Sequence, residues 1–170
     1  PPPGVGILTV SDGVAAGERD DRSGDLISAW VEERGFREVR RDVVADDRDE
    51  IVRRLLAWCD GDDCDLVLTT GGTGLAPRDV TPEATRTVVQ RPAPGIAERI
   101  RAVGAGSTPR AALSRGVAGV RSGTLVVNLP GSPSGVEDGL AVLGPLAVHG
   151  ARRLRGDPPD HSPGGAAEGA

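Results

Sequence analysis

The chain has 170 residues, a length that suits one domain with a substantial hydrophobic core. Its formal net charge of −5 argues against nucleic acid as the main partner, because a phosphate backbone needs a basic face. No apolar run approaches the length of a membrane span, so we expect no membrane partner. All the basic residues are arginine, which excludes a Walker-type phosphate loop and Schiff-base chemistry, since both need lysine.

The cysteines and histidines offer little for catalysis. Cys59 and Cys64 lie without a matching set of metal ligands, so a zinc site is disfavoured and a reduced thiol pair in a cytoplasmic protein is the simpler interpretation. His149 follows an apolar run and His161 lies in a low-complexity tail. Because histidine catalysis needs an oriented partner, we expect neither histidine to take part.

Strand and helix signals alternate in the first half of the chain. Residues 1–4 are expected to be a loose amino terminus, and the continuous apolar run 5–10 predicts a buried parallel strand. A helix ending at Gly35 follows, and then a strand of mixed polarity near a sheet edge, "EVRRDVVAD". Asp47 and Glu50 form an acidic capping box for the next helix, which leaves the Asp46 carboxylate free where the strand ends.

The same alternation continues in the second half. The run "DLVLTT" predicts a third strand, a glycine cluster follows it, and Thr81 is expected to cap the next helix, with further helix in residues 94–103. Residues 108–123 are interpreted as a connector, "TLVVNLP" as the last strong strand and residues 131–154 as a long helix. Residues 156–170 are rich in Pro, Gly and Ala and are expected to be disordered, so one domain covers residues 5–155.

This order of elements predicts the fold class α/β: a three-layer α/β/α domain with a doubly wound, mostly parallel sheet. In such sheets ligands bind at the carboxyl ends of the strands. Four loops begin at those ends: "SDG", "ADD", "GGTG" and "NLPGSP". Loops that meet at one edge of a sheet predict a ligand site better than any one of them does.

Asp46 and Asp79 are the carboxylates of greatest interest, because each lies in a loop that follows a predicted strand. Two carboxylates beside an anion-binding glycine loop repel a phosphate unless a cation lies between them, and Mg²⁺ prefers oxygen ligands. Ordinary cap or turn roles remain the alternative for each aspartate. The complementary positive charge is expected from one or more of four arginines: Arg78, Arg110, Arg115 and Arg121.

Several long segments, taken together, resemble the MogA/MoaB family of molybdopterin adenylyltransferases. They are "GILTVSDGVAAGERDDRSG", "VVADD", "LVLTTGGTGLAPRDVTPEAT" and "TPRAALSRGVAGVRSGTLVVNLPGSP". The resemblance implies that AMP passes from ATP to the terminal phosphate of molybdopterin, with Mg²⁺ as cofactor and pyrophosphate as product. It also implies a homotrimer, with a hexamer as the alternative, and hand-over of the product to a molybdate-insertion protein.

The resemblance places the essential acidic pair on Asp46 and Asp79, which we assign to catalysis and to Mg²⁺. It places the nucleotide and molybdopterin contacts on a larger set: Ser11, Asp12, Gly71, Gly72, Thr73, Gly74, Ser114, Asn128, Pro130, Gly131 and Ser132. Adenylyl transfer of this kind uses a phosphate oxygen that is already ionised, so no general base is required. Two alternatives stay open: a binding protein for molybdopterin that does not catalyse transfer, and a nucleotide pyrophosphatase on the same fold.

Overall fold

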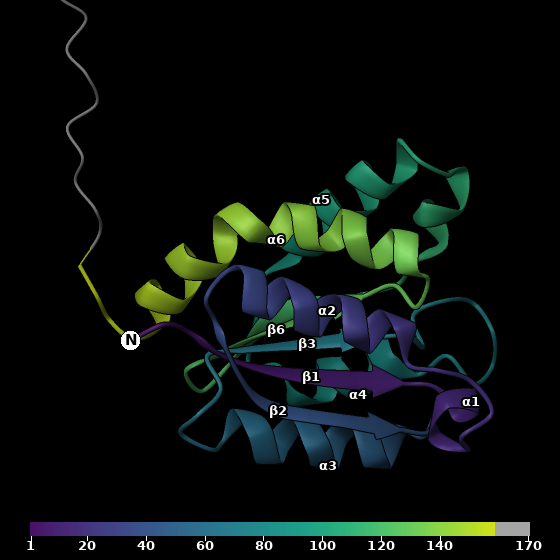
Figure 1. The fold of residues 1–170 in the computed structure, drawn as a ribbon, viewed down its shortest axis with the longest axis horizontal. Helices are drawn as coiled ribbons and strands as arrows, with labels where there is room; N and C mark the ends of the chain where they lie inside the picture. Colours follow the sequence, from purple (N-terminus) through teal and green to yellow (C-terminus); the bar gives the residue numbers. More distant parts are fainter. Residues whose placement is uncertain (159–170) are drawn as a thin grey trace, which may run out of the picture.

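The computed structural model describes residues 1–158 and forms one α/β/α domain around a six-stranded sheet (Figure 1). The strand order is β2-β1-β3-β6-β5-β4. The strands are β1 (Gly4–Val10), β2 (Arg37–Val44), β3 (Leu66–Thr70), β4 (Arg91–Pro92), β5 (Ala118–Arg121) and β6 (Thr124–Leu129). Strands β2, β1, β3 and β6 are mutually parallel, whereas β5 runs antiparallel to both of its neighbours. The predicted mostly parallel sheet is confirmed.

Helices cover both faces of the sheet (Figure 1). They are α1 (Asp12–Ala15), α2 (Arg22–Glu33), α3 (Arg48–Cys59), α4 (Thr81–Val88), α5 (Pro94–Ala105), the 3-10 helix η1 (Pro109–Leu113) and α6 (Pro133–Leu154). Successive strand residues point to opposite faces. Ile7 therefore packs in the cluster with α2, α5 and α6, whereas Leu8 packs in the cluster with α3 and α4. Both clusters are built mainly from aliphatic side chains, with one tryptophan in each.

The structure differs from the sequence-based expectation at the amino terminus. β1 begins at Gly4, and Pro3 is buried with its carbonyl accepting a hydrogen bond from the Arg37 N–H at 2.9 Å. Arg155 donates to the Pro1 carbonyl at 3.0 Å, so residues expected to form a loose end are tied to α6 and β2. Of the predicted disordered tail, residues 159–170 lie outside the described part of the chain.

Residues 108–123 are more than a connector. They contain η1 and β5, and β5 pairs with β6 on one side and with the two-residue strand β4 on the other. Gly119 permits this pairing, because a Cβ there would lie 2.2 Å from the Val89 side chain. Neither β4 nor β5 was expected from the sequence, and the expected connector is corrected here.

Two predicted helix caps have different outcomes. Asp47 caps α3, as predicted, by accepting a hydrogen bond from the Glu50 N–H at 3.0 Å. Thr81, in contrast, is the first residue of α4 and does not cap it. Its hydroxyl instead donates to the Gly71 carbonyl at 2.9 Å, which ties the start of α4 to the glycine loop.

Candidate functional site

Two cavities lie at the carboxyl ends of the parallel strands. The first, of about 840 Å³, is lined by the ends of β1 and β3, by residues 17–23 and by the start of α6. The second, of about 540 Å³, is lined by the glycine loop, α5, η1 and the start of α6. Four residues line both cavities: Gly72, Asp79, Gly131 and Ser132. The two cavities thus meet along the two glycine loops that were predicted to bind ligand.

The "GGTG" loop needs glycine at its first two positions. Gly71 and Gly72 have φ angles of +97° and +68°, a region that residues with a side chain rarely adopt. A Cβ on Gly71 would lie 2.2 Å from the Val10 carbonyl oxygen, and one on Gly131 would lie 3.2 Å from the Gly71 Cα. The glycine loop is therefore packed directly between the end of β1 and the loop after β6, with its backbone exposed to the cavities.

Asp46 is bound reciprocally to Asp12, across the ends of β2 and β1. The Asp46 Oδ2 accepts from the Asp12 N–H at 2.9 Å, and the Asp12 Oδ1 accepts from the Asp46 N–H at 3.0 Å. The expectation of a free Asp46 carboxylate is corrected in this respect, because one of its oxygens is used by the backbone. Partial burial raises the pKa of Asp46 above its usual value, and the charges of Asp12 and Asp79 act in the same direction.

Asp12 faces a cation instead of the cavity. Arg78 donates to both of its carboxylate oxygens, at 2.6 and 2.9 Å, and this lowers the pKa of Asp12 to about 2. The Asp12 side chain is therefore committed to positioning Arg78 and the Asp46 backbone. It does not line either cavity, unlike Ser11, which precedes it and caps α1 through a hydrogen bond from the Val14 N–H.

Asp79 lies against the glycine loop and the turn that follows it. Its Oδ2 accepts from the Ala76 N–H at 2.9 Å and would lie 2.8 Å from a Cβ on Gly74. Asp46 and Asp79 both line the first cavity. This common cavity is the arrangement that the predicted role as an acidic pair requires.

The remaining predicted contacts divide between the two cavities. Ser132 caps α6, accepting from the Gly135 N–H at 3.2 Å, and places the start of this 22-residue helix at the junction of the cavities. Four of the predicted contacts line the second cavity but not the first: Thr73, Gly74, Ser114 and Pro130.

Asn128 lies outside both linings. Its side chain is 3 % exposed and donates to the hydroxyls of Thr69 and Thr85 at 2.9 and 3.0 Å, while its Oδ1 accepts from the Val117 N–H at 3.1 Å. These bonds link β6 to β3, α4 and the residue before β5. In this structure the side chain acts within the fold rather than at the surface of a cavity.

The four arginines proposed from the sequence have different surroundings. Arg110 lines the second cavity, and Arg78 is held by Asp12. Arg115 forms an ion pair with Glu83 and donates to the carbonyls of Gly74 and Asp79. It therefore binds the backbone of the glycine loop and of the turn that follows it. Arg121 pairs with Asp60 and lines neither cavity.

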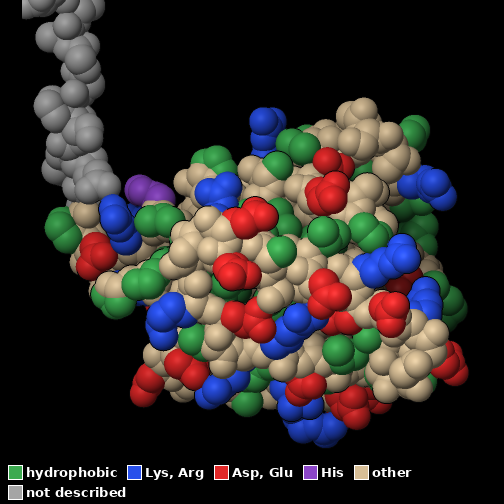
Figure 2. Space-filling model, viewed as in Figure 1, with side chains coloured by type: hydrophobic (Ala, Val, Ile, Leu, Met, Phe, Trp, Pro, Cys, Tyr) green, Lys and Arg blue, Asp and Glu red, His purple; other side chains and the backbone are tan. Residues whose placement is uncertain are grey.

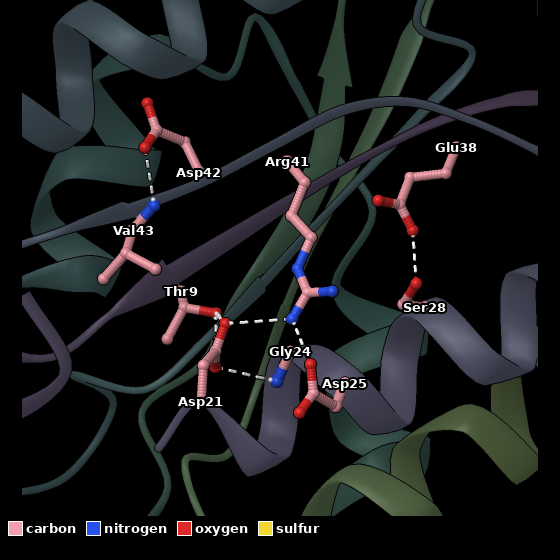
Figure 3. Close-up of polar contacts among 9 residues, drawn as sticks. All are labelled: Thr9, Asp21, Gly24, Asp25, Ser28, Glu38, Arg41, Asp42 and Val43. Atoms are coloured by element: carbon pink, nitrogen blue, oxygen red, sulfur yellow. Dashed lines mark hydrogen bonds and ion pairs between the residues drawn. The ribbon is translucent and has the colours of Figure 1, made fainter. Parts of the chain in front are cut away.

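Sequence analysis missed the part of the wall formed by residues 17–23. Asp21 caps α2 and accepts hydrogen bonds from the Thr9 hydroxyl and from Arg41, a network shown in Figure 3. Ser23 then donates to the Gly131 carbonyl at 2.7 Å. Arg19 and Arg22 of the same segment line the first cavity. The signal was present as an N-cap aspartate, Asp21, before a helix, but the segment was interpreted only as a loop.

Asp46 and Asp79 would suit a magnesium ion whose remaining ligands come from substrate and water. Asp46 and Asp79 each use Oδ2 for a backbone N–H, and carboxylate oxygens are the ligands that Mg²⁺ prefers. Within residues 1–158 no group of three or more His, Cys, Asp or Glu side chains is arranged to hold a metal ion. Mg²⁺ commonly binds through one or two carboxylates together with substrate phosphates and water, so two aspartates are sufficient.

On the face drawn in Figure 2, acidic and arginine side chains are interspersed. Among the helices of residues 1–158, none has the length and apolar character needed to cross a bilayer.

Comparisons with known proteins identify the family of this chain. Residues 6–149 match the family described as "Probable molybdopterin binding domain". A molybdopterin adenylyltransferase of Helicobacter pylori is 42 % identical over 143 residues, which are 83 % of this chain and 81 % of that protein. The molybdopterin adenylyltransferase of Escherichia coli is 35 % identical over 86 % of this chain and 78 % of its own length.

Solved structures give the same result. The molybdopterin biosynthesis enzyme MoaB of Thermus thermophilus superposes with a TM-score of 0.85 at 47 % identity, covering 92 % of this chain and 98 % of that one. The molybdopterin biosynthesis Mog protein of Mycobacterium ulcerans gives 0.85 at 40 % identity, covering 91 % and 99 %. The resemblance noted in the sequence is thereby confirmed: the chain belongs to the MogA/MoaB family of molybdopterin adenylyltransferases.

Proposed function

We propose that the protein transfers AMP from ATP to the terminal phosphate of molybdopterin in molybdenum cofactor biosynthesis, with Mg²⁺ as cofactor and pyrophosphate as product. The observation that carries the proposal is the common cavity of Asp46 and Asp79, which joins a second cavity along the two glycine loops. Two adjoining cavities suit a reaction between two substrates. Membership of the adenylyltransferase family supports the same reaction.

The residues at the junction suit a reaction between two phosphorylated substrates. The chemistry needs two anions held in line, while charge that develops on the α-phosphate and on pyrophosphate is stabilised. Gly72 and Gly131 bring the backbone close to any ligand there, and the start of α6 at Ser132 favours a negative group. Because the attacking phosphate oxygen is already ionised, the chain does not have to supply a general base.

Asp46 and Asp79 would hold the metal ion on the side of the first cavity. When bound, Mg²⁺ supplies positive charge that offsets the repulsion between these carboxylates and the substrate phosphates. The raised pKa of Asp46 fits a carboxylate that is relieved of unfavourable burial when a cation binds next to it. We further propose a homotrimer, or a hexamer as the alternative, that passes its product to a molybdate-insertion protein, as the family resemblance implies.

Neighbouring aspartates provide a matched test. Asp46→Asn and Asp79→Asn should each lower the rate of pyrophosphate release, measured with ATP, Mg²⁺ and molybdopterin, by about 100-fold or more, since each removes a charge at the reacting phosphates. Asp47→Asn is the control. It removes the same charge one residue away, and asparagine caps a helix as well as aspartate, so its rate should match the wild type.

The same assay separates the alternatives. Wild-type protein that binds molybdopterin but releases no pyrophosphate would be a binding protein. Hydrolysis of a free dinucleotide in the absence of molybdopterin would favour a nucleotide pyrophosphatase. Full activity of both Asp46→Asn and Asp79→Asn at low Mg²⁺ would refute their role as metal ligands.

A further inference from the structure

The lining of the first cavity carries an excess of negative charge that one metal ion would not neutralise. It includes five carboxylate side chains, from Glu18, Asp20, Asp21, Asp46 and Asp79, but only two cationic ones, from Arg19 and Arg22. Like charges disfavour a phosphate in such a site. With no lysine in the chain, any side-chain cation that contacts a phosphate here must be an arginine.

Two arginines that lie beside lining residues, but do not line the cavity themselves, are already paired with carboxylates. Arg78 is held by both oxygens of Asp12, and Arg41 by Asp25 and Asp21. The two arginines that do line the cavity, Arg19 and Arg22, form no ion pair within residues 1–158, so their charges are available to a ligand.

Arg19 is nevertheless held in position. Its Nη2 donates to the Ser11 hydroxyl at 3.4 Å, and the Gly13 carbonyl accepts from the N–H groups of Glu18 and Arg19. The guanidinium lies directly over Gly13, where a Cβ would be 2.7 Å from its Nε. Gly13 therefore provides the space that lets the side chain fold back toward the end of β1. Arg22 lines the same cavity, but in the described chain no hydrogen bond of its side chain fixes its direction.

We propose that Arg19 is a phosphate-binding residue of the first cavity, taking the role that a lysine has in other nucleotide-binding loops. The inference rests on the proposed function, since it concerns the substrate phosphates of that reaction. Ser11 precedes Asp12, whose N–H binds Asp46, so Arg19 lies on the Asp46 side of the cavity. A guanidinium suits this task because its planar fork donates two hydrogen bonds to a phosphate.

Calorimetric binding of Mg·ATP, adenosine and molybdopterin, each measured alone, tests this role without any turnover. Arg19→Gln should weaken Mg·ATP binding about tenfold or more, as expected for a lost charge-assisted bond, and should leave adenosine binding unchanged. Arg19→Lys should recover part of the affinity. Gly13→Ala keeps the charge but crowds the guanidinium, so it should give an intermediate loss. Arg53→Gln, an exposed α3 arginine outside both cavities, is the control and should bind like the wild type.

Each outcome decides something different. Weaker binding of Mg·ATP identifies a nucleotide phosphate as the partner of Arg19, whereas weaker binding of molybdopterin alone identifies the pterin phosphate. Unchanged affinity of Arg19→Gln for both ligands overturns the inference while leaving the proposed function intact. An equal loss for adenosine would also overturn it, since a phosphate contact cannot affect a ligand without phosphate. Wild-type protein that binds neither phosphorylated ligand refutes the proposed function and this inference together.

Discussion

Replacing Asn128 by alanine separates a structural role from a ligand role at a position that the sequence assigned to ligand binding. In the structure this side chain is buried and takes part in three hydrogen bonds. Two are donated to the hydroxyls of Thr69 and Thr85, and one is accepted from the Val117 N–H. Asn128→Ala removes all three and leaves their partners to find others in a closed interior.

The expected cost follows from these bonds. An N–H left without an acceptor costs about 1–3 kcal/mol, and each of the other two bonds contributes about 0.5–1.5 kcal/mol. Thr85 is the least affected partner, because its hydroxyl also donates to the Thr81 carbonyl at 2.8 Å. We therefore expect the free energy of unfolding to fall by about 3 kcal/mol, and the melting temperature to fall by about 6–12 °C for a chain of this size.

Urea denaturation gives the stability of the variant, and calorimetry below its transition gives its affinity for Mg·ATP and molybdopterin. We expect lower stability, with affinity close to that of the wild type in the folded fraction. The opposite result, wild-type stability with lost affinity, would refute the reasoning and return Asn128 to the set of ligand contacts.

Two further predictions concern the loops at the ends of β1 and β3. Arg78→Gln should raise the pKa of Asp12 from about 2 toward 3.8, as measured by carboxyl ¹³C NMR titration. Because the wild-type pKa is lowered in the folded state, the pair stabilises the protein above pH 3.8, and this contribution is lost as the pH falls toward 2. An unchanged pKa of Asp12 in the variant would contradict the pairing. Gly71→Ala should lower the free energy of unfolding by about 3 kcal/mol or more, because its Cβ would lie 2.2 Å from the Val10 carbonyl oxygen. Gly17 has a φ of +75° but nothing within 4 Å of a Cβ, so Gly17→Ala should lower it by only about 1–2 kcal/mol. Similar costs for the two variants would argue against the close packing at Gly71.

The three central parallel strands were predictable because they are buried on both faces. β1, β3 and β6 appear in the sequence as continuous apolar runs, and such runs are typical of central parallel strands. β4 and β5 gave no such signal. They have two and four residues and include Pro92 and Gly119. They are strands only because β6 pairs with β5 and β5 in turn pairs with β4. Pairing of this kind depends on distant residues, and a local pattern cannot reveal it.

The candidate site was predictable where it depends on strand ends, and less so where it depends on side-chain direction. Asp46 and Asp79 follow strands and reach a common cavity, as the topology predicts. Asn128 also lies at a strand end, but alternation along β6 places it on the same face as Val126, toward α3 and α4. Arg19 was missed because its direction is set by Ser11 and Gly13, through contacts that exist only after the loop has folded back.

Three side-chain hydroxyls hold the two glycine loops in place by hydrogen bonds to the loop carbonyls. Thr70, Thr81 and Ser23 all donate their hydroxyls to carbonyl groups of the two glycine loops, at Pro130, Gly71 and Gly131. These hydroxyls hold the loops in place and each satisfies one of their carbonyl oxygens. Under the proposed function, a ligand would bind the other N–H groups of the loops, the start of α6, Arg19 and the two aspartates. A site of this composition would then bind phosphate through amides, arginine and a metal ion, without lysine.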